Sequence, residues 1–219
     1  EVEDTIANGG KRIEINTVNA IKISANKLLM KQKFIEAGVK TANWYTFSNY
    51  LFYPNGDLTL GGTDQTRGVE TIEYPIVAKA HYGSKGRGNT LIKSQEELNT
   101  WMQGKTLNNY IFEKFMNFGH EFRLHVTEDG CFYTCRKALK QDVPEDQKWR
   151  RHDDICVWFL ETNENFQKPN SWNDIVSDCV KALKAVGADL LSFDVRVQTP
   201  RDKDGNLRSY QEYILLECN

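Results

Sequence analysis

The sequence predicts an α+β fold with antiparallel sheets, and three observations favour it. First, Asn55-Gly56-Asp57, Asp129-Gly130 and Asp204-Gly205-Asn206 have the composition of hairpin turns. Second, the last two of these turns are flanked by strand-like stretches. In some of them polar and apolar residues alternate, and the others are rich in β-branched and large apolar residues. Third, helical patterns interrupt the strand pairs without alternating strictly with single strands. Hairpins separated by helices favour antiparallel sheets over a doubly wound parallel sheet.

We expect strands at residues 74–79, 89–92, 110–116, 121–126, 131–139, 190–197 and 210–216. Three helices are expected between them. Residues 24–37 show apolar side chains available to a core, and Ser94 with Glu97 forms a capping box that opens a second helix. Residues 171–186 place apolar side chains at helical spacing and end before a glycine. The polar segment 141–154 is expected to be a mobile loop.

Composition limits the function classes. The 219 residues are 40% apolar with a net charge of −2, which is typical of a globular chain and argues against a protein that mainly coats nucleic acid or anionic membranes. No apolar run approaches the roughly 18 residues of a membrane span. Five cysteines without a Cys-x-x-Cys pair make a poor disulfide or zinc framework. We therefore expect a soluble, cytoplasmic protein with reduced thiols.

A glycine-rich loop follows a short strand that ends at Lys79. Glycines let backbone amides approach an anion closely, and a lysine beside them adds a fixed charge. The motif lacks the Gly-Lys-Ser/Thr of a Walker loop, and it is followed by a strand where a dinucleotide fingerprint has a helix. It predicts either a flap over phosphate groups or a plain surface turn. The loop residues are Gly83, Ser84, Lys85, Gly86, Arg87 and Gly88.

Two further groups of polar residues end apolar strands. Glu113 and Lys114 close the strand that starts at Tyr110, as either functional residues or a solvated edge pair. Asp194 is expected to pair across a hairpin with the segment that carries Glu217 and Asn219. Two carboxylates and an amide oxygen are hard ligands that suit Mg²⁺, although strand-end charges alone would explain them too.

The order of these motifs resembles the ATP-grasp superfamily. Among named proteins it most resembles carboxylate–amine ligases related to the ribosomal-protein glutamate ligase and D-alanine–D-alanine ligase, and it resembles more closely still an uncharacterised, often phage-encoded ATP-grasp group. The resemblance covers roughly residues 20–219, and the terminal Glu-x-Asn with an upstream Asp is its most specific part. It implies two lobes, with antiparallel sheets and flanking helices, that clamp ATP between them.

The resemblance also implies roles for individual residues. Lys27, Lys79 and the loop from Gly83 to Gly88 would contact ATP phosphates. Glu113, Lys114, Phe115 and Met116 would form the hinge strand that meets adenine, partly through backbone groups, and Glu121 would bind ribose hydroxyls. Asp194, Glu217 and Asn219 would hold Mg²⁺. Arg123, Arg136 and Arg150 match positions where cations lie near the transferred phosphoryl group or the acyl intermediate. Lys137 is less secure, because a regular strand would turn it to the other side from Arg136.

By the same resemblance, residues 20–116 would form an N-lobe with the flap and hinge strand, and residues 117–219 a C-lobe with the metal site. Residues 1–19 would be a lead-in, either a plain extension or a remnant of an N-terminal domain that the family usually has. The resemblance thus implies that the chain is the ATP-binding core of something longer. If it is phage-encoded, its compartment would be the host cytoplasm.

The implied activity is an ADP-forming ligase that activates a carboxylate as an acyl phosphate and joins it to an amine. The carboxylate and amine substrates could be small molecules or peptides. One alternative is an ATP-grasp kinase that phosphorylates a hydroxyl group. A non-catalytic nucleotide-binding module and a nucleic-acid module that uses Lys85, Arg87, Arg150 and Arg151 are further alternatives.

Overall fold

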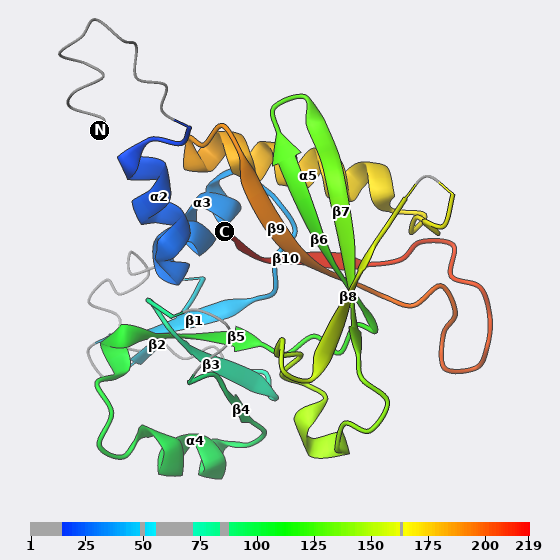
Figure 1. Cartoon of the computed structure of the whole chain (residues 1–219). Coiled ribbons are helices and arrows are strands. Elements are labelled where there is room, and N and C mark those ends of the chain that lie inside the picture. Colours follow the sequence, from blue (N-terminus) through cyan, green and yellow to red (C-terminus); the bar gives the residue numbers. More distant parts are fainter. Residues whose placement is uncertain (1–14, 49–50, 56–71, 84–87, 163) are drawn as a thin grey trace, which may run out of the picture.

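The strands form two antiparallel sheets. The computed structural model describes residues 15–48, 51–55, 72–83, 88–162 and 164–219. Within these ranges two sheets of five strands are formed, and all strand pairs are antiparallel. The predicted α+β class is confirmed, and Figure 1 shows the two sheets in different halves of the molecule. None of the described helices has both the length and the apolar character that a membrane span requires.

The first sheet has the strand order β2-β1-β5-β3-β4. Its strands are β1 (Trp44–Ser48), β2 (Leu51–Pro54), β3 (Ile76–Ala80), β4 (Thr90–Ile92) and β5 (Tyr110–Lys114), with the short 3-10 helix η2 (Leu107–Asn109) before β5. Helix α4 (Gln95–Met102) buries Leu98 against this sheet. Half of the predicted capping box is present, since the Ser94 hydroxyl accepts from the Glu97 amide, whereas the Glu97 carboxylate accepts from the amide of Lys93, one residue before the cap.

The second sheet has the order β10-β9-β6-β7-β8. Asp129-Gly130 joins β6 and β7, and Asp204-Gly205-Asn206 lies in the connection between β9 and β10, both as predicted. Strand β8 was not expected from the sequence. The strands are β6 (His120–Thr127), β7 (Gly130–Leu139), β8 (Cys156–Leu160), β9 (Leu191–Val197) and β10 (Tyr213–Cys218).

The first turn sequence does not join the strand pair beside it. Asn55 has the positive φ of 51° that such a turn needs, but it follows β2. Strand β2 pairs with the preceding strand β1, so this hairpin turns before Asn55. Gly56 and Asp57 lie outside the described residues.

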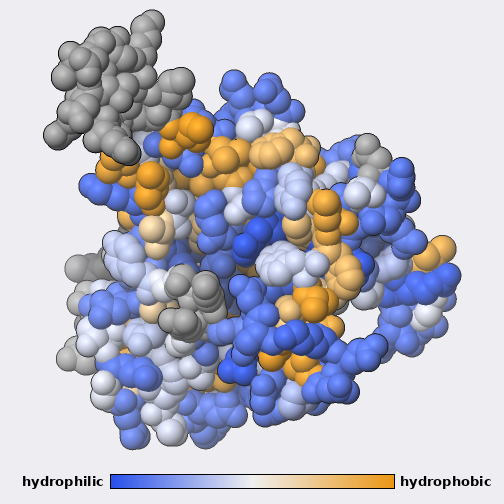
Figure 2. Space-filling view, viewed as in Figure 1, coloured by the Kyte–Doolittle hydropathy of each residue, from blue (hydrophilic) through white to orange (hydrophobic). Residues whose placement is uncertain are grey.

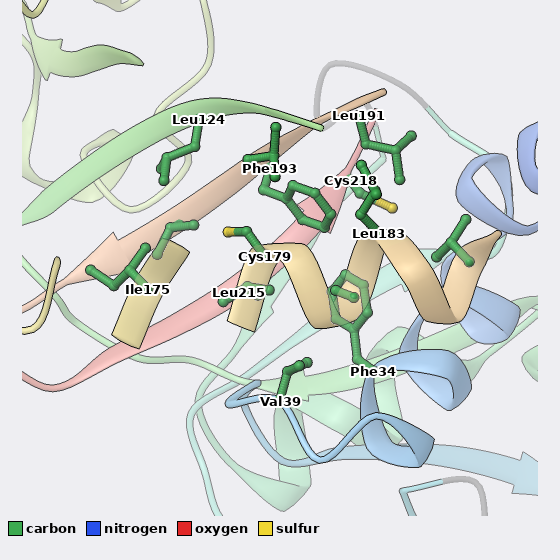
Figure 3. Packing of buried hydrophobic residues seen from close by; sticks show 14 of the residues in the cluster. Phe34, Val39, Leu124, Ile175, Cys179, Leu183, Leu191, Phe193, Leu215 and Cys218 are labelled. Carbon is green, nitrogen blue, oxygen red and sulfur yellow. The ribbon is translucent and has the colours of Figure 1, made fainter. Parts of the chain in front are cut away.

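Helix α5 (Trp172–Val186) covers one face of the second sheet. It is amphipathic as predicted, and Gly187 ends it in the left-handed conformation, with φ of 75°. Figure 3 shows Cys179 and Leu183 of α5 pointing toward Phe193 and Leu215 of the sheet. These contacts form the larger of the two hydrophobic clusters among the described residues.

The predicted helix at 24–37 is two helices, α2 (Val18–Ala25) and α3 (Lys27–Glu36). Asn26 separates them with an extended backbone, and its side-chain oxygen accepts hydrogen bonds from the amides of Leu28 and Leu29. Asparagine is a strong N-cap because its short side chain replaces the missing helical acceptor. The cap therefore starts α3 at Lys27, a predicted site residue.

Both N-terminal helices belong to the core of the second sheet. Ala20 of α2 and Met30 and Phe34 of α3 are buried in the cluster that contains α5. The sequence prediction grouped residues 20–116 as one lobe, whereas the cores divide the chain so that α2 and α3 lie with residues 117–219. Figure 1 shows α3 above the first sheet, next to α2 and on the side of β10.

The packing at Phe193 provides a test of this core. Its side chain is fully buried, and its ring lies 6.3 Å from that of Phe34 on α3. We expect Phe193→Ala to lower the free energy of unfolding by about 3–5 kcal/mol, because it leaves a cavity between α3 and the sheet. Urea denaturation measures this loss. Phe132→Ala, at a ring that is 63% exposed, is the control and should change stability by less than about 0.5 kcal/mol.

Candidate active site

A cleft between the two sheets contains most of the predicted site residues. Its volume is about 360 Å³, enough for a small-molecule ligand. Gly88 and Arg136 do not line it, and Ser84, Lys85, Gly86 and Arg87 lie outside the described residues. The predicted residues that line the cleft are Lys27, Lys79, Gly83, Glu113, Lys114, Phe115, Met116, Glu121, Arg123, Arg150, Asp194, Glu217 and Asn219.

Glu113 is buried between two lysines. Its Oε1 accepts a hydrogen bond from Lys79 Nζ at 2.9 Å, and its Oε2 lies 2.9 Å from Lys31 Nζ. Burial alone would raise the pKa of Glu113, but the positive charges of Lys31 and Lys79 lower it to about 2. Lys31 was not among the site residues predicted from the sequence. It connects α3 to the first sheet through this carboxylate.

Lys27 begins α3 and connects three segments. Its Nζ donates to the Gly83 carbonyl at 2.8 Å and lies 3.5 Å from Glu217 Oε2 on β10. Its backbone amide donates to the His81 carbonyl at 2.9 Å. The N-terminus of α3, the start of the glycine loop and the end of β10 therefore meet at one ammonium group.

Asp194 forms a two-pronged ion pair with Arg123. The guanidinium Nε and Nη2 each lie 2.7 Å from one carboxylate oxygen. Asp194 is 4% exposed, and burial raises its pKa to about 6 against the opposing effect of Arg123. The nearby charge of Glu217 contributes to this raised pKa. The two carboxylates therefore interact electrostatically.

A β-bulge brings these carboxylates to the same face. Leu215 pairs with Val195, and Glu217 pairs with Asp194, so Leu216 is an extra residue on β10. Regular alternation would place Glu217 on the core side with Leu215, because side chains alternate faces along a strand. The extra residue reverses the phase and turns Glu217 into the cleft.

Glu121 has two cationic neighbours. Its carboxylate accepts a hydrogen bond from Arg196 Nε at 3.2 Å and lies 3.8 Å from Lys137 Nζ. Arg196 was missed, although an arginine inside the apolar strand from 191 to 197 was a detectable signal. The proposed role of Glu121 toward ribose therefore involves a carboxylate that already has protein partners.

Arg136, predicted near the transferred phosphoryl group, lies outside the cleft, and Lys137 lines it instead. Arg136 pairs with Phe122 on the core side of β6 and donates to Glu161 Oε1 at 2.6 Å. The cause is a second bulge. Val126 pairs with Cys131 and His125 with Tyr133, so Phe132 is unpaired and shifts the alternation of β7 by one residue.

One part of the cleft is apolar. Val77 belongs to β3 and Phe115 directly follows β5, so both come from the side of the first sheet. Ile214 and Leu216 belong to β10. Met116 lies beside them, and its carbonyl accepts from Arg196 Nη1 at 3.3 Å. These apolar residues of the lining could contact a flat, weakly polar group.

The segment between β7 and β8 forms another wall. It contains a short 3-10 helix, η3 (Glu145–Gln147), followed by Trp149, Arg150, Arg151, His152 and Asp153, all of which line the cleft.

The cleft is cationic although the chain is not. Eight lysine and arginine side chains line it against five aspartate and glutamate side chains, whereas the whole chain has a net charge of −2. A cavity with low-dielectric walls and excess positive charge attracts anions. The arrangement therefore suits a ligand that has a flat, weakly polar part and several negative charges.

Comparison with solved structures identifies the fold. D-alanine–D-alanine ligase from Bacillus anthracis matches with a TM-score of 0.60 at 16% identity, over 100% of this chain and 64% of that chain. L-amino acid ligase from Bacillus licheniformis matches with a TM-score of 0.58 at 16% identity, over 99% and 44%. The ATP-grasp ligase PsnB, in complex with a minimal precursor, matches with a TM-score of 0.56 at 15% identity, over 97% and 57%.

The chain has the ATP-grasp fold. This confirms the fold that the motif order predicted. The chain spans less than two thirds of the length of these ATP-grasp structures. No family model and no curated protein matches the sequence. A further structure of the Bacillus anthracis ligase holds ATP.

The pKa of Glu113 predicts how stability depends on pH. The pKa of Glu113 is about 2 in the folded protein, below its ordinary value of 4.5. The ionised group therefore stabilises the fold fully above pH 4.5, and this contribution is lost as the pH falls from 4.5 to 2. We expect Glu113→Gln to lower the free energy of unfolding at pH 6 by about 3 kcal/mol, because two lysines lose a buried partner. The difference from wild type should shrink at pH 3.

Urea denaturation at pH 6, 4.5 and 3 measures both effects. Glu128→Gln, at an exposed hairpin residue, is the matched control and should follow the wild type. A constant difference between Glu113→Gln and wild type across this range would contradict the assignment.

Proposed function

We propose that this chain is the ATP-binding core of an ADP-forming ligase that activates a carboxylate and joins it to an amine. The observation that carries the proposal is the convergence of Lys27, Lys79, Asp194 and Glu217 on one cleft. Lysines suit the phosphates of a nucleotide, and the two carboxylates suit a divalent cation bound to those phosphates. A surface turn or a solvated ion pair would not need this convergence.

The cleft offers a place for each part of ATP. The apolar lining residues, Phe115 and Leu216 among them, suit adenine, and backbone groups of the hinge strand are proposed to meet it. Lys27 and Lys79 suit the phosphates, and Gly83 begins the loop proposed to cover them. Glu121 is proposed to bind the ribose, sharing its carboxylate with Arg196.

The residues proposed for Mg²⁺ fit that ion. Asp194 and Glu217 are direct partners across β9 and β10, and Asn219 follows on the same strand end and lines the cleft. Two carboxylates brought to one face by a bulge, together with an amide oxygen, offer the hard oxygen ligands that this ion prefers. When bound, Mg²⁺ would neutralise phosphate charge and orient the terminal phosphate.

The chemistry follows from this arrangement. A carboxylate oxygen of the substrate attacks the γ-phosphorus of ATP, and the bond to the bridging oxygen breaks to release ADP. The amine nitrogen then attacks the acyl carbon, phosphate leaves, and the nitrogen loses a proton. Arg123 and Arg150 are proposed to stabilise the negative charge that develops in both steps, and Lys137 extends this cationic wall. No enzyme nucleophile takes part.

Product analysis tests the reaction class. The protein is incubated with ATP, Mg²⁺ and mixtures of carboxylates and amines, and products are identified by mass. An amide formed together with ADP and free phosphate would support the proposal. A stable phosphoester would indicate a kinase, and an unchanged mixture with bound ATP would indicate a nucleotide-binding module.

Removing one charge from the proposed metal site should stop turnover. We expect Asp194→Asn and Glu217→Gln each to lower the rate of Mg²⁺-dependent ATP consumption by about a hundredfold or more, because the cation and phosphates lose a charged partner. Glu128→Gln makes the same chemical change as Glu217→Gln at an exposed residue and should retain full activity. Normal ATP consumption in either site variant would rule out the metal assignment.

A further inference from the structure

The wall of the cleft between β7 and β8, residues 145–153, has no buried side chain of its own. Its residues are polar or charged apart from Trp149, and Figure 2 shows mostly hydrophilic residues on the surface where Figure 1 places this segment. Near its end, Asp153 lies 3.1 Å from Lys137 Nζ of β7. Polar contacts must therefore fix the wall, because a segment without buried apolar side chains gains little from packing.

Arg196 of β9 reaches this wall from the sheet. Its Nη2 donates to the Trp149 carbonyl at 3.1 Å, its Nε to Glu121 at 3.2 Å and its Nη1 to the Met116 carbonyl at 3.3 Å. The guanidinium carbon lies 5.7 Å from the centre of the Phe115 ring. A guanidinium has several donors in a rigid fork, so it can meet separate segments at once. One buried side chain thus connects the proposed adenine hinge, the proposed ribose carboxylate and the wall.

The Trp149 carbonyl depends on this guanidinium more than the other two groups do. The Met116 carbonyl also accepts from the Phe118 amide at 2.9 Å, and Glu121 also lies 3.8 Å from Lys137 Nζ. In the part of the chain that the structure describes, the Trp149 carbonyl accepts no second hydrogen bond. Loss of the fork would therefore release the wall and leave the other two groups with a partner.

Arg151 makes a second connection, from the wall back to the hinge. Its Nη2 donates to the Gly119 carbonyl at 2.6 Å and to the Phe118 carbonyl at 3.5 Å, both in the connection between the hinge and β6. Burial lowers the pKa of Arg151, and the positive charge of Arg196 contributes to this lowering, as expected for two guanidinium groups that lie near each other. Arg151 also has a φ of 46°, which is uncommon outside glycine and persists where surrounding contacts fix the backbone.

The wall carries Arg150, which is proposed to stabilise the charge that develops in the reaction. Its Nη2 donates to Gln147 Oε1 at 3.2 Å, and its amide donates to the Gln147 carbonyl at 3.1 Å. Among the described residues its hydrogen bonds thus stay within the wall. The place of Arg150 in the cleft therefore depends on where the wall is held.

We propose that Arg196 is a positioning residue that couples nucleotide binding to the wall, and through the wall to Arg150. A nucleotide that restricts the hinge and Glu121 also restricts the guanidinium that joins them, so less conformational entropy remains to be lost when the wall is fixed. This inference rests on the proposed function and adds a sequence to it, in which the base and ribose fix the wall before the carboxylate reacts.

Hydrogen exchange with adenosine tests this coupling. Adenosine has the base and ribose but no phosphates, so it has no negative charge that the arginines of the wall could bind directly. The variant is Arg196→Lys, which keeps a positive charge beside Glu121 but has one ammonium group in place of the fork. The matched control is Arg201→Lys, at an exposed arginine that donates to the Gly205 carbonyl at 2.6 Å. Each protein is compared at a saturating concentration of adenosine, determined by calorimetry.

We expect adenosine to slow the exchange of amides in residues 148–155 by about fivefold or more in wild type and in Arg201→Lys. In Arg196→Lys these amides should exchange faster than in ligand-free wild type, and adenosine should change their rate by less than about twofold. A merely structural role would speed exchange throughout the second sheet and would not separate adenosine binding from protection of the wall.

Two results would overturn the proposal. One is adenosine that binds wild type without slowing exchange in the wall, which is measured even if Arg196→Lys fails to fold. The other is slowing in Arg196→Lys equal to that in wild type. If neither adenosine nor ATP with Mg²⁺ binds wild type, the proposed ligase function fails. Faster exchange of the wall in ligand-free Arg196→Lys would then still support the contact between Arg196 and the wall, and unchanged exchange would overturn that contact too.

Discussion

The burial of one carboxylate, Glu113, between Lys31 and Lys79 holds the two halves of this protein in register. Lys31 belongs to a helix in the core of the second sheet, whereas Glu113 and Lys79 belong to adjacent strands of the first sheet. Ion pairs at a solvated surface contribute little, but a buried carboxylate cannot lose a partner without a large cost. The cleft is therefore bounded by an interaction that resists separation, and Lys79 is oriented by it.

The same triad explains why the cleft retains free positive charge. Glu113 neutralises charge deep in the interface, and Asp194, Glu121 and Glu217 each have a cationic neighbour. Arg150 and Arg151, in the wall formed by residues 149–153, are the lining cations without a carboxylate partner among the described residues. An anionic ligand would complete this charge pattern, which agrees with the proposal that a nucleotide binds there.

Local signals predicted much of the fold. The turn at Asp129-Gly130, the N-cap at Ser94 and the end of α5 at Gly187 depend on interactions within a few residues, so the sequence reveals them. Lys31 could not be predicted as a buried residue, because its partner Glu113 lies 82 positions away, on a strand of the first sheet. The exchange of Arg136 for Lys137 has the same origin, since a bulge depends on pairing between strands and not on the alternation of one strand.

The two bulges also change how this sequence can be compared with others. Phe132 and Leu216 are each one extra residue in a strand. The extra residue changes the length of the strand little, but it reverses which side chains face the cleft. A related chain that lacked either residue would align poorly by its hydrophobic pattern and yet keep the same cleft. Conversely, a chain aligned without a gap at Leu216 would appear to bury an acid in its core. Comparisons across distant sequences are thus more reliable when strands β7 and β10 are aligned by their cleft-facing charges than by their apolar residues.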